Sequence, residues 1–415
     1  MEENRKKPQI RFEGYTDDWE QRKLCDVLSL LKDGTHGTHK DSDYGPFLLS
    51  AKNIKNGQII IDDLSDRRIS QDAFDQIHST FKLQKDDVLL TIVGSIGETA
   101  ILENADGLTF QRSVAFLRPN GEMTSRFLRT EIEADRFQKE LQDRKSQSAQ
   151  PGVYLGELEK IPVIFPKIGE QKKIADYFSN LDNLITLHQR KYNKLVDVKK
   201  SMLEKMFPKN GEKKPEIRFC GFTDDWEQRK LSEIYASIGN AFVGTATPYY
   251  VEQGHFYLES NNIKDGQINH NSEVFINDEF YERQKEKWLH TGDMVMVQSG
   301  HVGHAAVIPE ELDNSAAHAL IMFREPKEKI EPYFLNYQYQ TNKIKKKIDG
   351  ITTGNTIKHI LASDMQEFVV DLPDYNEQKQ IGDYFRNLDH LITLHQREVE
   401  KLKNIKKSML EKMFI

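Results

Sequence analysis

The stretch EQKKIADYFSNLDNLITLHQRKYNKLVDVKKSMLEKMF at residues 170–207 returns as EQKQIGDYFRNLDHLITLHQREVEKLKNIKKSMLEKMF at residues 377–414, with 28 of 38 positions identical. A second stretch repeats at the same offset of 207 residues: PQIRFEGYTDDWEQRKL at 8–24 returns as PEIRFCGFTDDWEQRKL at 215–231, with 14 of 17 positions identical. A unit of this length far exceeds the roughly 20 to 50 residues of a solenoid repeat. The sequence therefore indicates a duplicated domain, each copy followed by the same connector.

Both copies of the connector carry an apolar stripe in which steps of three and four residues alternate, the heptad pattern of a coiled coil. At about 1.5 Å per residue each helix would be about 55 Å long. Because neither stripe is stable alone in water, we expect the two helices to pack on each other, antiparallel if the halves are related by a two-fold axis. Two histidines lie in the stripe, where we expect a polar residue that fixes register. The stripe comprises Ile174, Phe178, Leu181, Ile185, His188, Tyr192, Leu195 and Met202, and then Ile381, Phe385, Leu388, Ile392, His395, Val399, Leu402 and Met409.

Between the repeated blocks the two halves diverge but keep a common skeleton, such as KNIKNGQI against NNIKDGQI. Short β-branched or alternating runs predict strands, and apolar residues at helical spacing predict helices. The expected fold is mixed α/β, with two similar globular modules joined by two long helices. The predicted strands are 88–93, 99–102, 114–117, 294–298 and 319–323, and the helical stretches are 124–145 and 331–350. The predicted domains are a conserved segment 1–24, a first module 25–169, a first helix 170–207, a conserved linker 208–231, a second module 232–376 and a second helix 377–415.

Length and composition exclude several classes of protein. A chain of 415 residues that is 38% hydrophobic and 30% charged, with a mean hydropathy of -0.66, suits two or three globular domains. No apolar run approaches the ~18 residues of a membrane-spanning helix, and the N-terminus MEENRKKPQIRF lacks a signal-peptide core, so we expect a cytoplasmic protein. The net charge of -7 means that nucleic-acid binding would need local basic patches. Cys25 and Cys220 are too few for a disulfide framework or a Cys-rich zinc site.

Motifs for catalysis and nucleotide binding are absent from the sequence. There is no GxxxxGK[ST], no GxGxxG after a strand, no HExxH and no GxSxG. The glycines of VGSIGETA and SGHVGHAA lie between two short predicted strands, which favours hairpin or bulge geometry over a phosphate cradle. His36 and His39 in one half, and His301, His304 and His318 in the other, do not share a metal-ligand pattern, so no metal site is expected.

The ordered combination of these features, present twice, resembles the specificity subunit of type I restriction–modification systems. The resemblance covers essentially the whole chain. It is carried by DWEQRKL before each module, by the openings KDGTHGTHK and GNAFVGTATP, by KNIKNGQI and NNIKDGQI, and by EQKxIxDYFxNLDxLITLHQR at the start of each helix. It implies two target-recognition domains that each read one half of a split double-stranded DNA site, and no catalytic residues.

The same resemblance implies the partners of the chain. Two methyltransferase subunits would dock on the conserved helices, and restriction and translocation subunits would join them. S-adenosylmethionine, ATP and Mg are expected on those subunits, with no cofactor bound by this chain, and adenine is the methylated base implied. Half-sites on one face of B-DNA lie about 34 to 36 Å apart or a multiple of this, a distance that a helix pair of the expected length can span. Because the two modules differ, the site should be asymmetric.

Base readout requires hydrogen-bonding side chains on exposed loops, and both modules offer such loops at comparable places. An ordinary polar turn is the alternative for any single residue. In the first module the candidates are Thr35, His36, Thr38, Lys52, Asn53, Gln111, Arg112, Ser146, Gln147, Gln150 and Tyr154. In the second they are Asn240, Thr245, Asn261, Asn262, Gln298, Ser299, His301, Thr353, Asn355, Thr356 and Lys358.

Phosphate contacts should come from cations near these loops, although a solvated helix face would look similar. The candidates are Arg136, Lys139, Arg144 and Lys145 before the first loop and Lys343, Lys345, Lys346 and Lys347 before the second. Two other functions stay open at this point. A stand-alone methyltransferase or nuclease would need a cofactor loop and an NPPY-like motif, neither of which is found. A coiled-coil scaffold that binds proteins would show no salt-dependent, sequence-selective DNA affinity.

Overall fold

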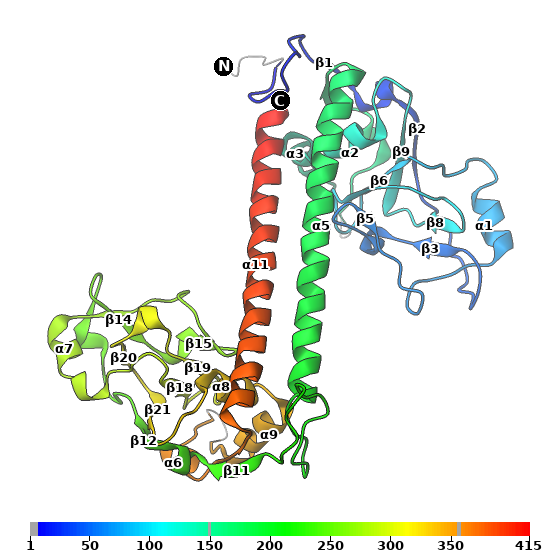
Figure 1. Ribbon diagram of the computed structural model, residues 1–415. Coiled ribbons are helices and arrows are strands. Elements are labelled where there is room, and N and C mark those ends of the chain that lie inside the picture. The colour runs from blue at the N-terminus through cyan, green and yellow to red at the C-terminus, as the bar shows by residue number, and fades with distance from the viewer. Residues whose placement is uncertain (1–6, 148–150, 355–357) are drawn as a thin grey trace. The chain divides into compact units, whose positions relative to one another are not determined.

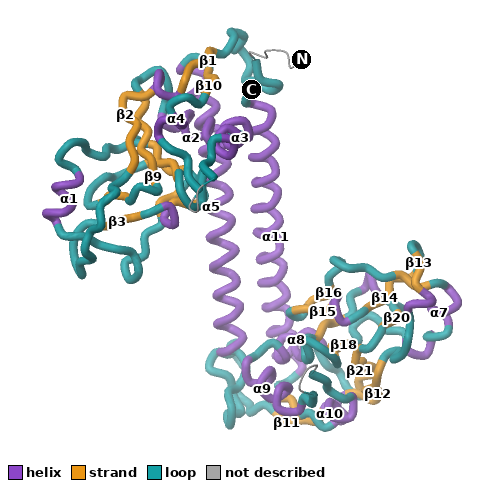
Figure 2. Tube along the Cα trace, turned by 180° about the vertical axis from the view of Figure 1, so that it is seen from behind, coloured by secondary structure: helices purple, strands orange, loops and turns teal. Residues whose placement is uncertain are grey.

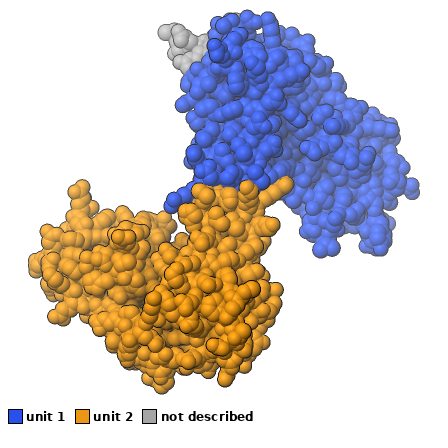
Figure 3. All heavy atoms as spheres, in the orientation of Figure 1, with its two compact units in different colours: residues 1–189, 396–415 blue, residues 190–395 orange. Residues whose placement is uncertain are grey.

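The computed structural model describes residues 7–147, 151–354 and 358–415. The chain divides into two compact units, coloured separately in Figure 3: unit 1 is residues 1–189 with 396–415, and unit 2 is residues 190–395. Each unit therefore contains one module together with a half of each long helix. The boundary between the units lies within the two helices and not at the predicted module ends.

Unit 1 is built on a four-stranded antiparallel sheet in the order β2-β9-β6-β7 (Figure 1). Along β6, Val88 and Leu90 join the core that contains the helices, whereas Leu89 joins a second core on the other face. Since side chains alternate between the faces of a strand and both faces are covered, the run is apolar throughout. The bounds are β2 (Leu28–Asp33), β6 (Val88–Thr91), β7 (Thr99–Ile101) and β9 (Val114–Pro119).

Helices cover one face of this sheet, and short strands with one small helix cover the other. On the first face, Phe127 of α2 and Phe137 of α3 are fully buried with Phe178 of α5. On the second, Leu49 of β3 and Phe110 of β8 pack beneath the sheet, and these two strands pair in parallel. The bounds are α1 (Gln71–Ile77), α2 (Ser125–Glu133), α3 (Asp135–Asp143), α4 (Leu155–Leu158), α5 (Ile168–Lys205), β3 (Phe47–Leu49), β4 (Ile54–Lys55), β5 (Gln58–Ile59) and β8 (Leu108–Phe110).

Unit 2 repeats this arrangement, with the sheet order β12-β21-β18-β19 (Figure 2). Met294 and Met296 of β18 face the helices, while Val295 and Val297 face the smaller strands. The sheet strands and helices are β12 (Tyr235–Asn240), β18 (Met294–Val297), β19 (Ala305–Val307), β21 (Leu320–Pro326), α6 (Leu231–Ile234), α7 (Asp278–Glu282), α8 (Pro332–Tyr339), α9 (Asn342–Ile351), α10 (Ala362–Gln366) and α11 (Tyr375–Met413). The smaller strands are β13 (Tyr250–Val251), β14 (His255–Leu258), β15 (Ile263–Lys264), β16 (Gln267–Ile268), β17 (Phe275–Ile276) and β20 (Ala316–Ala317).

The conserved segment before each module is part of that module's fold. In unit 1, β1 (Glu20–Lys23) pairs antiparallel with β10 (Pro162–Phe165), and in unit 2, β11 (Glu227–Lys230) pairs with β22 (Val369–Leu372) in the same register. A bidentate ion pair then ties the segment to the helix that follows. The Arg11 guanidinium donates to both oxygens of buried Glu170 at 2.7 and 2.8 Å, and Arg218 donates to Glu377 at 2.6 and 2.7 Å. This explains why both ends of the repeat are conserved together within the chain.

Within each unit the two long helices run antiparallel. In unit 1, Phe178 of α5 faces Phe414 and Asp182 faces Lys406, so residue numbers rise along α5 as they fall along α11. In unit 2, Lys199 of α5 faces Asp389 of α11, and Phe207, just after α5, lies against Phe385, which gives the same antiparallel sense. No residue of the predicted stripe is exposed. The two helices begin two residues earlier than the repeated blocks at 170 and 377.

Most of the predicted elements are observed, with one correction. The predicted strands correspond to β6, β7, β9, β18 and β21, and both glycine-containing stretches are hairpins that join antiparallel strands. Each of the helical stretches 124–145 and 331–350, however, is broken into two helices. Ala134 is extended with a ψ of 143° and both ends one helix and starts the next. Within the described residues no helix combines the length and apolar character needed to cross a membrane.

Candidate nucleic-acid interface

Hydrogen bonds of the main chain join the polar loops of unit 1 into one surface, here called the unit 1 edge, residues 34–39, 92–97, 110–113, 146–147 and 151–154. The first segment of each edge, residues 34–39 in unit 1 and 241–246 in unit 2, is called the opening loop. In unit 1 it lies beside the end of β8, because the Thr35 N–H donates to the Phe110 carbonyl and the Thr35 carbonyl accepts from the Arg112 N–H. The next contact runs from the Ile92 N–H to the Ser113 carbonyl at 2.9 Å, and Val153 donates to Ile92 at 2.9 Å. The edge therefore combines loops that lie more than 100 residues apart in sequence.

Tight packing holds the opening loop in place. A Cβ on Gly34 would lie 2.2 Å from the Phe110 carbonyl oxygen, so only glycine permits this approach. The Thr35 hydroxyl is 2.8 Å from Nε2 of His39, and His36 Nε2 is 2.6 Å from Asp33 Oδ2. His36 and Thr38 are exposed, so the loop presents polar side chains to solvent on a fixed backbone.

Unit 2 has the corresponding unit 2 edge, residues 241–246, 298–304, 317–319, 353–354 and 358–360. Phe242 donates to the Ala317 carbonyl and its own carbonyl accepts from Ala319, as Thr35 does with Phe110 and Arg112. At the other end Gly300 donates to the Lys358 carbonyl at 3.0 Å. The backbone frame of the edge is thus repeated, while the side chains on it differ.

The prediction that Asn53 and Asn262 read bases is corrected by the structure. Both side chains are buried, at 4% and 1% exposure. Asn53 accepts from the Ser50 N–H and donates to the Ile60 carbonyl, and Asn262 accepts from the Glu259 N–H and donates to the Asn269 carbonyl. The Asn53 amide fixes the turn between β3 and the β4–β5 hairpin, and the Asn262 amide fixes the turn between β14 and the β15–β16 hairpin. The NIK motif that the two halves share therefore forms a structural turn.

Lys52 is exposed but ion-paired with Asp66 at 2.7 Å, which competes with any contact to DNA. Asp66 also accepts from the Asp62 N–H and from the Asn53 amide. Although burial opposes ionisation, these hydrogen bonds and the Lys52 ammonium lower the pKa of Asp66 to about 2. Asp66 thus holds in place the loop that follows β5, residues 60–65.

Half of the predicted phosphate contacts are engaged inside their own unit, which corrects those predictions. Arg136 pairs with buried Glu131 and donates to the Pro162 carbonyl. Burial raises the pKa of Glu131 to about 7 against the opposing effect of that guanidinium. In unit 2, Lys343 pairs with buried Asp371 at 2.6 Å.

Two more of these cations also contact their own unit. Arg144 pairs with Glu140 on the same helix. Lys347 donates to the Val369 carbonyl, and burial lowers the pKa of its ammonium group. Four of the predicted cations remain exposed: Lys139, Lys145, Lys345 and Lys346.

The structure places the other predicted readers on or beside the two edges. Gln111, Ser146, Gln298 and Ser299 are half-buried. Arg112, Gln147, Tyr154, Asn240, Thr245, Asn261, His301, Thr353 and Lys358 are exposed. His301 Nε2 lies 3.0 Å from the Ser260 carbonyl, and Lys358 pairs with Asp349. Gln150, Asn355 and Thr356 fall outside the described residues.

His318 on the unit 2 edge was considered in the sequence only as a metal ligand. The offset of 207 places it opposite Gln111, and the main-chain pattern agrees: Gln111 donates to the Leu49 carbonyl, and His318 donates to Leu258. Alignment of the two halves at this offset would have identified His318 as the counterpart of Gln111, which was predicted to read bases. Among described residues no group of three His, Cys, Asp or Glu side chains could hold a metal ion.

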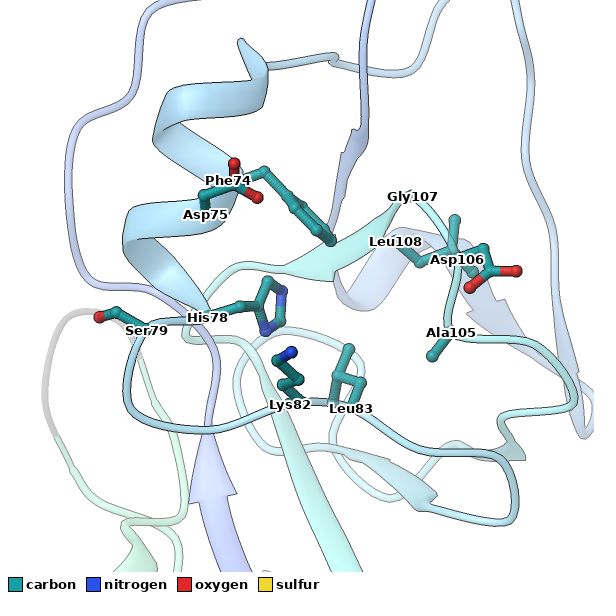
Figure 4. A pocket seen from close by; sticks show the side chains of 10 residues that line it. All are labelled: Phe74, Asp75, His78, Ser79, Lys82, Leu83, Ala105, Asp106, Gly107 and Leu108. Atoms are coloured by element: carbon teal, nitrogen blue, oxygen red, sulfur yellow. The ribbon is translucent and has the colours of Figure 1, made fainter.

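A hollow of about 520 Å³ opens at the opposite end of β8, between α1 and the chain at 105–108 (Figure 4). His78 points into it beside Lys82, and Phe74 covers it from the helix. In unit 2 aromatic side chains fill the corresponding place. The local offset is 206 residues here, because the Gln84 N–H donates to Asp87 as the His290 N–H donates to Asp293, and Trp288 is therefore the counterpart of Lys82. Trp288 stacks on Tyr281 at 4.3 Å, and the Tyr281 hydroxyl donates to the Asn314 carbonyl.

Known proteins are similar to this chain along its whole length. The family described as type I restriction modification DNA specificity domain matches residues 16–196 and again residues 223–404. In Methanocaldococcus jannaschii, the candidate specificity subunit of the type I restriction enzyme MjaX is 26% identical over 99% of this chain and 95% of its own length. The MjaIX specificity subunit of that organism is 22% identical over 95% and 92%. The crystal structure of a type I restriction-modification S subunit from M. genitalium superposes with a TM-score of 0.60 at 14% identity, covering 99% of both chains, and supports the fold.

Proposed function

The chain belongs to the type I restriction–modification DNA specificity family, and from this premise we propose how it selects DNA: each unit reads one half of a split, asymmetric site through its edge. A specificity subunit is a non-catalytic part of its complex, so its contribution is to select the site and to position the subunits that act there. The chemistry on the selected DNA would then belong to the partner subunits.

The observation that carries this proposal is that one backbone frame appears twice with different side chains on it. Thr35 and Gln111 of the unit 1 edge are replaced by Phe242 and His318 on the unit 2 edge, although the main-chain hydrogen bonds are the same. Base edges are told apart by the donors and acceptors that face them. Two edges of different chemistry therefore select two different half-sites.

Exposed polar side chains on the two edges are the proposed base readers. In unit 1 these are His36, Thr38, Arg112 and Gln147, with half-buried Thr35, Gln111 and Ser146 beside them. In unit 2 they are Thr245, His301, Thr353 and Lys358, with Gln298 and Ser299. Lys139, Lys145, Lys345 and Lys346 are the proposed phosphate contacts, because their ammonium groups remain exposed.

We assign docking of the methyltransferase subunits to exposed leucines on the long helices. Leu184 and Leu187 of α5 are 44% and 46% exposed, and their repeats Leu391 and Leu394 of α11 are 40% and 44% exposed. Exposed apolar side chains that recur at the offset of 207 fit two copies of one partner. Two methyltransferase subunits and the restriction and translocation subunits would assemble there, carrying S-adenosylmethionine, ATP and Mg. The complex would act in the cytoplasm, where the DNA it modifies lies.

We further propose that the long helices set the spacer between the half-sites. α5 has 38 residues and α11 has 39, and each continues from one unit into the other without a break. At about 1.5 Å per residue such a helix is about 57 Å long, which is long enough to span half-sites that lie one turn of B-DNA, about 34 to 36 Å, apart. The length of the helices would then determine the number of unread base pairs.

Methylation mapping of a host genome tests the proposal directly. The full chain is co-expressed with its methyltransferase subunit, and modified bases are located by single-molecule sequencing, with a control that lacks the chain. A split, asymmetric motif that depends on the chain is the expected result and gives both half-sites and the spacer. If the complex assembles but no motif depends on the chain, the interpretation as a DNA-reading subunit is wrong. A gel shift with randomised duplexes then distinguishes a protein-binding scaffold.

A further inference from the structure

His318 bridges two parts of the unit 2 edge. It lies between β20 and β21, and its ring stacks at 5.8 Å on that of buried Tyr257. One ring nitrogen, Nδ1, is 3.3 Å from Oε1 of Glu259, at the end of β14. The other, Nε2, is 3.0 Å from the carbonyl oxygen of Gly244, in the opening loop. The ring therefore connects the opening loop to the strand layer beneath it.

The chemistry of the two partners fixes the protonation state that satisfies both. A carboxylate and a main-chain carbonyl are acceptors only. Neutral imidazole has a single N–H and can donate to one of them, whereas imidazolium donates to both. The bridge from Glu259 to Gly244 is complete only when His318 carries a proton on each nitrogen.

We propose that His318 is a positioning residue for recognition of the second half-site, which holds the opening loop of unit 2 through the Gly244 carbonyl while it is protonated. The inference rests on the proposed DNA-reading function. Gly244 lies between Val243, which is 60% exposed, and Thr245, a proposed base reader. Release of the carbonyl would free these exposed residues, so affinity for the second half-site should fall as pH rises.

The groups around the ring favour the protonated form. The Glu259 carboxylate raises the pKa of His318 from its usual 6.5, although partial burial opposes the shift. The His318 ring in turn lowers the pKa of Glu259, and the Tyr250 hydroxyl, which donates to the same oxygen at 2.7 Å, adds to this. The Tyr257 hydroxyl faces Gln284 and not the ring. Because the pKa of His318 is raised, the bridge is complete at low pH and is lost as pH rises through that value.

Unit 1 provides the internal comparison. Its equivalent residue is Gln111, which does not titrate. The opening loop of unit 1 is held by the hydroxyl of Thr35 against His39, and a hydroxyl can donate or accept. That contact therefore does not depend on an imidazolium, and unit 1 has no imidazole bridge at the position of Gln111.

The test measures DNA affinity of the full chain in complex with its methyltransferase subunits between pH 5.5 and 8.5 at constant ionic strength. The probe is a duplex that carries the mapped site, with variants in which either half is scrambled. We expect the wild-type complex to bind about tenfold more weakly at high pH, as for loss of one charge-assisted hydrogen bond. His318→Gln should flatten most of the slope, and Glu259→Gln should move its midpoint to lower pH. His290→Gln, which changes an exposed histidine outside the edge, should keep the wild-type slope.

The outcomes separate this inference from the proposed function. If no duplex is bound selectively at any pH, the DNA-reading function itself fails. If selective binding is found but the wild-type slope is unchanged in His318→Gln, or unchanged when the second half-site is scrambled, the role of His318 is refuted. Titration of the His318 ring by NMR in the free chain, with His318→Gln to assign the signal, gives a reading without DNA. A midpoint at or below 6.5 would also overturn the inference.

Discussion

The antiparallel helix pair contains one ion pair at equivalent places in each unit, and removal of its lysine should weaken the units unequally. In unit 2, Lys199 Nζ is 2.6 Å from Asp389 Oδ1, and the two side chains are 15% and 12% exposed. The Tyr337 hydroxyl also donates to Asp389 at 2.8 Å. In unit 1 the corresponding lysine is Lys406, which is 2.7 Å from Asp182.

The magnitude follows from burial and from the remaining partners. At an effective dielectric constant of about 20, charges 2.6 Å apart attract by about 6 kcal/mol, and desolvation of both ions offsets much of this. Loss of one partner from a buried pair costs about 3 to 5 kcal/mol. Because some solvent still reaches Lys199, we expect Lys199→Met to lower the free energy of unfolding of unit 2 by about 2 to 3 kcal/mol.

Unit 1 should be affected less, because its network contains a second cation. Lys406 also contacts Glu133 at 2.7 Å. The Arg129 guanidinium is 2.6 Å from Asp182 and 2.7 Å from Glu133, so it still pairs with both carboxylates when Lys406 is removed. At the equivalent positions unit 2 has Asn336 and Gln340, which are neutral. Lys406→Met should therefore cost about 1 kcal/mol less than Lys199→Met.

Urea unfolding followed by hydrogen exchange and mass spectrometry reports on each unit separately, which matters because the two need not unfold together. Lys200→Met and Lys407→Met are matched controls, since both lysines are exposed at equivalent positions, and should stay within about 0.5 kcal/mol of wild type. The charge swap Lys199→Asp with Asp389→Lys should recover part of the loss. Equal costs for the two lysines, or a cost at Lys199 no larger than in the controls, would refute the role of these pairs.

Three further predictions concern the spacer, the hollow and the acid stability of unit 1. Insertion of one heptad into both long helices should lengthen the spacer of the methylated motif without changing either half-site, and methylation mapping that shows altered half-site bases would contradict this. Lys82→Trp, which copies Trp288 of the other half, should fill the hollow and stabilise unit 1 by about 1 kcal/mol in thermal unfolding, whereas Lys85→Trp on the exposed loop should not. Since the pKa of Asp66 is lowered from 3.8 to about 2, its hydrogen bonds stabilise unit 1 above pH 3.8, and this contribution is lost as pH falls toward 2. Asp66→Asn should cost about 1 to 2 kcal/mol at neutral pH and remove that part of the acid dependence, as measured by urea unfolding across this range.

The sequence predicted the features that depend on periodicity and on repetition. The heptad stripe identified the helix seam because apolar spacing reports directly on which face is buried. The strands of the central sheets were also predictable, since runs such as those at 88–91 and 294–297 are apolar on both faces. The break at Ala134 was not, because the apolar spacing continues through it and only the extended backbone of this residue separates the two helices.

The candidate site was less predictable because polar residues look alike in sequence whether they face solvent or a buried partner. Arg136 and Lys343 occupy equivalent positions, and both neutralise a buried carboxylate. That carboxylate is Glu131 on α2 in unit 1 but Asp371 on β22 in unit 2. Only the folded chain shows that the carboxylate lies on a helix in unit 1 and on a strand in unit 2, although the cation occupies the same position in both. A basic cluster in sequence is therefore weak support for a phosphate contact until its acidic neighbours are known.

The same comparison explains how the two halves can diverge at the edges and still share a fold. The conserved blocks contain the groups that hold each frame, including the bidentate pairs of Arg11 with Glu170 and of Arg218 with Glu377. The edges, in contrast, are joined by main-chain hydrogen bonds, which do not depend on the side chain. Histidine in place of Gln111 at the equivalent position therefore leaves the backbone pairing intact, and changes how the opening loop is held and what the surface offers to a ligand. A fold of this kind can change the DNA bases it selects without a matching change in its core.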